Sequence, residues 1–240
     1  MGPNHKDVRE YYDKVYYKEL ISPHGRPSRH LQGLVEKLAL KKSDRILDVA
    51  CGSGEWLRVA QESVSEVAGI DISEKAIEAC RKVMPDGRFS TGPAEELPYA
   101  DNEFDVVTCL GSLEHFLDQQ GALEEILRVA KQDARILILV PNSGFLTYRL
   151  GLYRGTNQQN IRETIRSLDE WAKLFERAGL EVNGRWKDLH VLSRRWIFRT
   201  PFYLVPLRML QAAMLVIWPL NWQYQVYFEC RPISSFSIRR

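Results

Sequence analysis

Cysteine is scarce in this chain of 240 residues, and none of its four copies belongs to a Cys-x-x-Cys pair. They stand at positions 51, 80, 109 and 230, with no cluster of histidines beside them. The pattern indicates neither a disulfide framework nor a metal site, and we expect reduced thiols in a cytoplasmic protein. The first residues, MGPNHKDVREYY, lack the apolar stretch of a secretory signal peptide.

Acidic residues are nearly absent from the C-terminal part of the chain. Seven arginines and a single acid, Glu229, follow Asp188, a net charge of +6 that leaves −4 for residues 1–188. Residues 189–222 contain no acid and combine arginines with tryptophan, phenylalanine and leucine. This composition is typical of an element that lies in a membrane interface, and equally of a helix that covers a pocket. Met209–Phe228 is uncharged, but polar residues interrupt it too often for a transmembrane helix.

Apolar runs alternate with helical patterns along most of the chain. The runs that predict strands are RILDVA, EVAGIDI, RFST, FDVVTCL, ARILILV, LEVNGRWK and QYQVYFECR. The segments between them place apolar residues at helical spacing, and Ser73 is expected to cap the helix that begins at Glu74. Such alternation predicts parallel βαβ units, and continuous apolar strands predict a sheet that is covered on both faces.

These patterns define the expected fold. The fold class is α/β, a doubly wound and mostly parallel seven-stranded sheet with helices on both faces, whose ligand lies at the carboxyl ends of the strands. An apolar, basic insertion is expected between the last two strands. The predicted parts are an N-terminal lid segment at 1–30, a ligand-binding core at 31–188, the insertion at 189–222, and the last strand with its tail at 223–240.

The glycine-rich turn in ILDVACGSGEW lacks the features of a phosphate site. A dinucleotide fingerprint needs a third glycine where Leu57 stands, and Glu55 is unfavourable for an anion. Asp71 ends the second strand and suits the hydroxyls of a ribose, whereas Asp48 precedes the turn and suits an ammonium group. A ribose and an ammonium without a phosphate describe S-adenosylmethionine. Taken singly, Asp71 also fits a helix-terminal acid, and Asp48 a structural partner of the turn.

An ordered set of motifs resembles the class I S-adenosylmethionine-dependent methyltransferases. The motifs are ILDVACGSGEW, GIDIS, GPAEELPYADNEFDVVTCLGSLEHF and EILRVAKQDARILILVPN. The chain looks most like the bacterial group that includes the ubiquinone-pathway O-methyltransferases, which shares LEH after the fourth strand and PN after the fifth. Relatives often have Asp where Pro93 stands, and Pro-Gly-Gly where this chain has a predicted surface turn, Gln132–Ala134.

The resemblance implies a set of cofactor-binding residues, and no metal is expected from the cysteine and histidine pattern. The set is Asp48, Gly52, Gly54, Asp71, Ile72, Ala94, Glu95 and Leu110. The two glycines pass beneath the methionyl part of the cofactor, with the first aspartate nearby. Asp71 holds the ribose, and Leu110 offers its carbonyl to the ammonium. Ile72 lies against the adenine, with Ala94 and Glu95 at its edge.

Methyl transfer from a sulfonium is an in-line displacement, so the protein positions the acceptor and, for a hydroxyl acceptor, removes a proton. His115 is the expected general base because it follows the fourth strand, although it also suits a residue that orders the loop. Glu114 and His190 are weaker candidates. The stretch YYDKVYY, Tyr11 to Tyr17, is expected either to close the lid or to pack on the core.

The sequence therefore predicts methyl transfer from S-adenosylmethionine to a small, lipophilic acceptor, with O-methylation favoured. The alternatives are transfer to a soluble small molecule and a scaffold that binds the cofactor without catalysis. We expect an element at 194–220 to touch the inner face of a membrane through Arg194, Arg195, Arg199 and Arg208. The acidic body argues against a nucleic-acid partner.

Overall fold

The structure, a computed structural model, describes residues 4–17, 29–149, 151, 163–190, 197–198 and 200–233. Its strands are β1 Arg45–Val49, β2 Glu66–Asp71, β3 Arg88–Thr91, β4 Phe104–Leu110, β5 Ala130–Pro141, β6 Leu180–Lys187 and β7 Gln225–Pro232. Its longer helices are α1 His5–Tyr11, α2 Arg29–Lys37, α3 Glu55–Ala60, α4 Glu74–Val83, α5 Gln119–Val129, α6 Leu146–Arg149, α7 Leu168–Arg177 and α9 Val205–Ile217. Shorter helical turns are η1 Tyr12–Tyr16, η2 Leu113–His115, η4 Phe202–Leu204 and η5 Leu220–Trp222.

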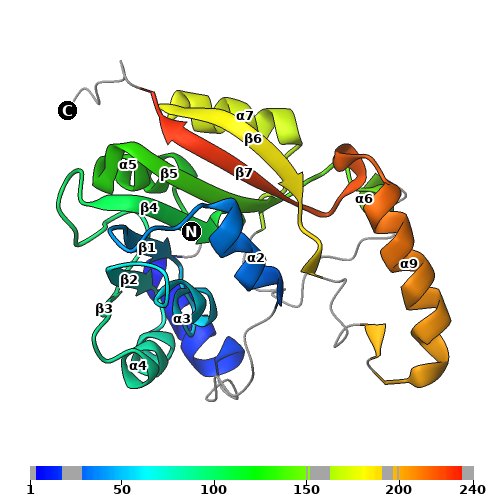
Figure 1. Cartoon of the computed structure of the whole chain (residues 1–240), viewed down its shortest axis with the longest axis horizontal. Helices are drawn as coiled ribbons and strands as arrows, with labels where there is room; N and C mark the ends of the chain where they lie inside the picture. The colour runs from blue at the N-terminus through cyan, green and yellow to red at the C-terminus, as the bar shows by residue number, and fades with distance from the viewer. Residues whose placement is uncertain are drawn as a thin grey trace.

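The strands form one seven-stranded sheet in the order β3-β2-β1-β4-β5-β7-β6 (Figure 1). Neighbours among β1 to β5 run parallel, whereas β7 runs antiparallel to both β5 and β6. The α/β fold with a mostly parallel seven-stranded sheet is therefore confirmed. Parallel order also brings the ends of β1, β2, β3 and β4 to one edge of the sheet, where a ligand site is expected.

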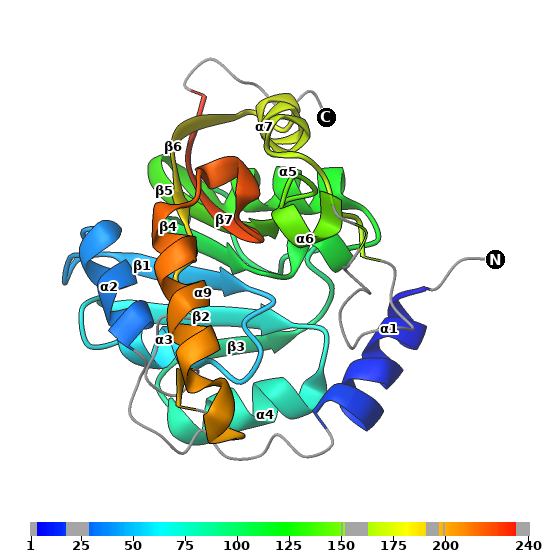
Figure 2. The same cartoon turned by 90° about the vertical axis from the view of Figure 1, so that its right-hand side faces the viewer.

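Helices cover both faces of the sheet because its central strands are apolar on both sides. Ile46 and Leu47 are neighbours in β1, yet they lie in two different hydrophobic cores. The core around Leu47 is completed by α5 and α7, and the core around Ile46 by α2, α3 and α4 (Figures 1 and 2). The predicted cap is confirmed too, since the Ser73 hydroxyl accepts a hydrogen bond from the amide of Ala76 at the start of α4.

The predicted surface turn at Gln132–Ala134 is wrong. Strand β5 already begins at Ala130 and runs through these residues, and α5 ends at Val129. Phe104 pairs with Ala130 and Val106 pairs with Arg135, so β5 carries extra residues opposite a short stretch of β4. A bulge of this kind keeps the chain extended and turns polar side chains outward, which removes the need for a turn.

Residues between β6 and β7 include α9, which stands beyond the carboxyl end of β5 (Figures 1 and 2). Its C-terminal end is held by Gln223, whose amide donates to the Leu215 carbonyl at 2.7 Å, and by Lys187, whose ammonium donates to the Val216 carbonyl at 2.7 Å. Within the described ranges, no helix is long and apolar enough to cross a membrane. Three arginines of the predicted membrane element lie outside the described residues: Arg194, Arg195 and Arg199.

Candidate active site

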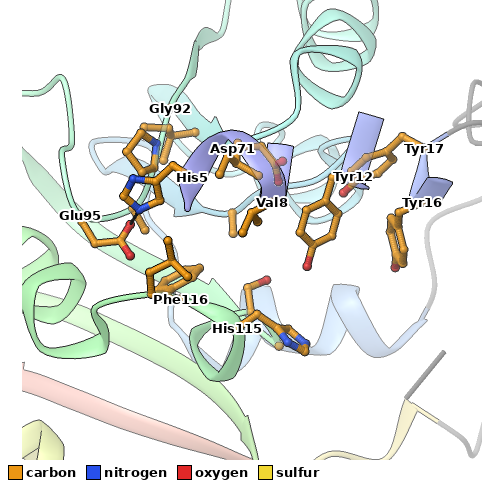
Figure 3. Close-up of a pocket in the computed structure, with 18 residues that line it drawn as sticks. His5, Val8, Tyr12, Tyr16, Tyr17, Asp71, Gly92, Glu95, His115 and Phe116 are labelled. Atoms are coloured by element: carbon orange, nitrogen blue, oxygen red, sulfur yellow. Dashed lines mark ion pairs between the residues drawn. The ribbon is translucent and has the colours of Figure 1, made fainter. Parts of the chain in front are cut away.

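A cavity lies at the carboxyl edge of the parallel strands, beneath α1 and η1 (Figure 3). Its empty space, including the part open to solvent, measures about 740 Å³. Five predicted site residues line it: Asp71, Ile72, Ala94, Glu95 and His115. The wall also contains Tyr12, Tyr16 and Tyr17 of the stretch that was expected to close the lid or pack on the core. Residues without a role predicted from the sequence line it too, and they include His5, Val8, Ala50, Phe116 and Leu117.

Asp71 is fixed at the end of β2 by the backbone of two loops. One carboxylate oxygen accepts from the amide of Gly52 at 2.8 Å, and the other accepts from the amide of Ser73 at 2.9 Å. Burial raises the pKa of Asp71, while these backbone hydrogen bonds oppose the increase. Each oxygen has a second lone pair, so the carboxylate remains able to accept hydrogen bonds from a pair of ligand hydroxyls.

The two glycines of the turn face different parts of the molecule. Both adopt a positive φ, +53° at Gly52 and +75° at Gly54, which favours glycine. A Cβ at Gly54 would lie 2.6 Å from the Met84 side chain and 2.9 Å from the Cys80 sulfur, so packing on α4 also requires glycine there. A Cβ at Gly52 would lie 3.0 Å from the Tyr17 hydroxyl, which is on the cavity side.

Asp48 lies under the turn rather than in the described cavity wall. It is only 4% exposed, and it accepts a hydrogen bond of 2.6 Å from the Thr108 hydroxyl. The same hydroxyl oxygen accepts from the indole N–H of Trp56 at 3.1 Å. Burial raises the pKa of Asp48 to about 7, against the lowering effect of Thr108. Near neutral pH the carboxyl group of Asp48 is therefore partly protonated and partly ionised. A nearby ammonium would favour the ionised form.

The loops that follow β1 and β4 complete the floor of the cavity. Ala50 has a φ of +59°, a strained value for a residue with a Cβ, and it lies in the cavity wall. Leu110 is the last residue of β4 and is not among the described wall residues, whereas the next two residues, Gly111 and Ser112, are part of the wall. Sequence reasoning missed Ala50, although its place between a strand and a glycine turn was a signal.

Two ionisable residues of η2 differ in their surroundings. His115 and Phe116 lie across the cavity from Val8 and the tyrosines of η1 (Figure 3). The amide of His115 donates to the Ser112 carbonyl at 2.9 Å and closes the η2 turn. Glu114 is 3% exposed, and one of its carboxylate oxygens is buried without a hydrogen-bond partner in the described part of the chain. Burial raises the pKa of Glu114 to about 8.

Glu95 links the far end of the cavity to the N-terminal helix. One carboxylate oxygen accepts from the amide of Asp118 at 3.1 Å, and the other lies 3.5 Å from Nε2 of His5 (Figure 3). Ile72 and Ala94 contribute apolar surface beside it. His5 gave no signal in the sequence, because its partner is ninety residues away and only the fold brings them together.

The N-terminal segment is docked onto the loop that follows β2. Arg9 donates to the Ile72 carbonyl at 3.1 Å, and Lys75 donates to the Asp13 carbonyl at 2.7 Å. The Asp13 carboxylate accepts from the Ser73 hydroxyl. The side chains of Val8 and Tyr17 are each 8% exposed, so the segment also buries apolar surface over the cavity.

His190, a weaker candidate from the sequence, lies away from this cavity. Its Nδ1 contacts the carboxylate of Asp188, which is also 3.2 Å from Nε2 of His30. The same nitrogen of His30 lies 2.8 Å from the Tyr227 hydroxyl. The structure therefore gives His190 a structural pairing and places it outside the described wall of the candidate site.

The fold and this site agree with the comparisons to known proteins. The family described as a methyltransferase domain matches residues 24–183. An uncharacterised methyltransferase of Bacillus subtilis, YcgJ, is 33% identical over 208 residues, which cover 82% of this chain and 78% of the relative. The chain belongs to the methyltransferase domain family and is a class I methyltransferase that uses S-adenosylmethionine as its cofactor.

Two further relatives carry names that specify an acceptor. A demethylmenaquinone methyltransferase of Thermotoga maritima is 29% identical, covering 58% of this chain and 63% of the relative. A 27-O-demethylrifamycin SV methyltransferase of Amycolatopsis mediterranei is 34% identical, covering 62% of this chain and 58% of the relative. The chain thus spans about three fifths of the length of each of these two relatives.

Solved structures confirm the fold. A structure of the Haloferax volcanii Trm112 methyltransferase activator in complex with its partner contains a chain that superposes with a TM-score of 0.71 at 18% identity, covering 94% of this chain and 97% of the other. The [4+2]-cyclase SpnF has a TM-score of 0.67 at 21% identity, covering 96% and 97%. Since one neighbour is named a cyclase, the fold by itself does not define the reaction.

The residues of the cavity fit S-adenosylmethionine. Asp71 has a buried carboxylate that would accept from ribose hydroxyls, and Ile72 and Ala94 have apolar surface that would suit a base. Among the described wall residues there is no lysine or arginine, as expected for a ligand without phosphates. The buried carboxylate of Asp48 offers a counter-charge for the ammonium.

Proposed function

We propose that this chain transfers a methyl group to a hydroxyl of a small, lipophilic acceptor at the inner face of a membrane. The observation that carries this acceptor class is α9. Leu207 and Leu210 are each 60% exposed and Ile217 is 76% exposed, whereas Ala212 is the one residue of this helix that is buried. A surface helix normally turns its apolar side chains toward the protein, so α9 suits contact with an apolar phase.

The position of α9 supports access from that phase to the cavity. The helix stands at the carboxyl end of β5 (Figures 1 and 2). The cavity lies at the carboxyl ends of the other parallel strands. Asn142, just after β5, donates to the carbonyl of Asn221 at 2.8 Å and so attaches the segment after α9 to this edge. The two relatives named for demethylmenaquinone and for 27-O-demethylrifamycin SV support a small-molecule acceptor, and the second supports transfer to oxygen.

Within this proposal, each site residue has one task. Asp71 accepts hydrogen bonds from the ribose hydroxyls, and Asp48 balances the ammonium, to which Leu110 offers its carbonyl. The turn through Gly52 and Gly54 lets the backbone pass close beneath the methionyl part. At the adenine, Ile72 forms one face, with Ala94 and Glu95 at the edge.

The remaining chemistry is the removal of a proton from the acceptor. The bound cofactor supplies a methyl group on a good leaving group, and His115 takes the hydroxyl proton of the acceptor as general base. The N-terminal segment within residues 1–30 acts as the lid, because Val8 and the tyrosines of η1 close the cavity opposite His115. Closure of this lid over the bound cofactor would exclude water from the sulfonium.

The test is methyl transfer from labelled S-adenosylmethionine to a total cell extract that has been split into lipid and water-soluble fractions. The proposal expects label in the lipid fraction and its loss when His115 is replaced by alanine. Label in the water-soluble fraction would favour a soluble acceptor instead. A protein that binds the cofactor but labels neither fraction would be a non-catalytic scaffold.

A further inference from the structure

A second cavity lies between α2 and the end of β6, away from the cofactor site. Its wall consists of Arg29, His30, Gly33, Leu34, Lys37, Trp186, Lys187 and Leu189. We propose that this cavity binds the phosphate of an anionic phospholipid, with the start of an acyl chain along its apolar wall. The inference rests on the membrane contact proposed above and gives it a specific lipid site.

Three cations of the wall make the cavity suitable for an anion. Within the described ranges, neither Arg29 nor Lys37 nor Lys187 forms an ion pair with a carboxylate. The ammonium of Lys37 lies 4.8 Å from the centre of the Trp186 ring, which holds it beside the cavity. Lys187 uses one N–H for the Val216 carbonyl and keeps two others for a ligand.

Two acids adjoin this wall in sequence, Glu36 beside Lys37 and Asp188 beside Lys187, and in the described part of the chain neither forms an ion pair with these cations. Asp188 is 9% exposed, and its carboxylate is shared between His30 and His190. The hydrogen bond that Asp188 accepts from the ring of His190 raises the pKa of His190, so this carboxylate favours the positively charged form of that histidine. The net charge presented to a ligand by the wall is therefore positive.

The rest of the wall is apolar, which favours an amphiphilic anion over a small inorganic one. Leu34, Trp186 and Leu189 supply this surface. Gly33 faces open space, since a Cβ placed there would meet nothing within 4 Å. A phosphate near the cations and a chain along Trp186 would each have a partner, whereas free phosphate would leave the apolar wall in contact with water.

The cavity also shares its surroundings with α9. Lys187 is at once part of the wall and the residue that holds the carbonyl of Val216 near the end of α9. If α9 lies among lipid headgroups, the cations of the cavity wall, which adjoin its C-terminal end through Lys187, lie at the depth of the lipid phosphates. Each cation near an anionic surface contributes about 1 kcal/mol, or roughly fivefold in affinity.

The experiment uses two substitutions on one helix that change the charge equally. Gly33→Glu places a carboxylate in the cavity, and Gln32→Glu places one on the exposed neighbouring position. Sedimentation with vesicles of phosphatidylcholine, with and without phosphatidylglycerol, measures the preference for anionic lipid. We expect Gly33→Glu to lose about fivefold or more of that preference, and Gln32→Glu to lose less than twofold. Equal behaviour of the two variants would overturn the proposal.

A soluble lipid separates failure of this site from failure of the membrane contact. Dihexanoyl phosphatidylglycerol below its micelle concentration is titrated while tryptophan fluorescence is followed, with glycerol phosphate and inorganic phosphate as comparisons. Saturable binding by wild type and not by Gly33→Glu supports the site, even if wild type fails to sediment with vesicles. No binding of the short-chain lipid, or equal binding of inorganic phosphate, contradicts it. The affinity for S-adenosylmethionine should stay unchanged in both variants.

Discussion

The N-terminal segment of α1 with η1 and the C-terminal helix α9 both stand at the carboxyl edge of the sheet, and both lie outside the matched residues 24–183. The two segments differ in whether their apolar side chains are buried or exposed. The first buries Val8 and Tyr17 over the cofactor cavity and is fixed by hydrogen bonds from Arg9 and to Asp13. The second leaves Leu207 and most of its other apolar side chains exposed.

The difference in exposure suits two separate functions at the carboxyl edge of the sheet. A segment that buries its tyrosines over a cavity closes the site toward the cofactor. A helix that exposes its apolar residues offers a surface to something outside the chain. Variants on the cavity side should therefore change cofactor binding and chemistry in any medium, whereas variants of α9 should change only reactions that involve lipid.

The largest effect is expected on the cavity side, at His115. His115→Ala should lower turnover by roughly 10²–10⁴-fold, because the acceptor proton loses its base. The affinity for S-adenosylmethionine should change less than about twofold, since the ring acts on the acceptor. Single-turnover kinetics together with calorimetry measure the two effects. If turnover falls only a few-fold, His115 orders the loop and is not the base.

Asp71→Ala should weaken cofactor binding at least tenfold, with little effect on vesicle binding. The change removes two charge-assisted hydrogen bonds to the ribose, each worth about 1.5–3 kcal/mol at most. It also leaves the amides of Gly52 and Ser73 without their acceptor, so Asp71→Asn serves as the milder companion. If calorimetry finds equal affinity for S-adenosylmethionine in wild type and both variants, Asp71 does not bind the ribose.

On the other side of the comparison, Leu207→Ser combined with Leu210→Ser should weaken vesicle binding about tenfold. Each leucine is 60% exposed, so the loss comes from apolar area that lipid would bury and not from the folded core. The midpoint of thermal unfolding and the affinity for S-adenosylmethionine should stay close to wild type. Ala212→Ser, at the buried position of the helix, is a control that should keep vesicle binding.

The smallest effect is expected at Asp48, and it depends on pH. Burial raises the pKa of Asp48 from 3.8 to about 7, so between these values the folded chain keeps a proton that the unfolded chain releases. The free energy of unfolding therefore falls as the pH rises from about 4 to 7, because the buried carboxyl group of Asp48 disfavours the ionised form that the unfolded chain adopts freely. Asp48→Asn should stabilise the cofactor-free protein by at least about 1 kcal/mol at pH 8 and much less at pH 5. Thermal unfolding at both values checks this, and an equal difference at both would contradict it.

Much of the sheet and one end of the site could be predicted from the sequence because those features are local. The apolar runs identified all seven strands, and Asp71 was recognised from its place at the end of the second strand, whereas Ile72, Ala94 and Glu95 were implied by the family resemblance. These residues reach one cavity because parallel strands end at one edge.

Other features depend on partners that are distant in the chain. Thr108 donates to Asp48 across sixty residues, and His5 meets Glu95 only after the N-terminal segment has docked. The bulge at Gln132 arises from the pairing of β5 with β4, which no local pattern encodes. The lack of acidic residues at 189–222 distinguished the segment that contains α9 from the rest of the chain, but only the structure shows that the leucines of α9 are exposed.

The most direct test of the account is the transfer of labelled methyl groups to a lipid extract presented in anionic vesicles. Wild type and the Leu207→Ser, Leu210→Ser variant are compared at saturating S-adenosylmethionine, after calorimetry has shown equal cofactor affinity. We expect label in the organic phase for wild type and about tenfold less for the variant. Label that appears in the organic phase at equal rates for both proteins, or only in the aqueous phase, would contradict it.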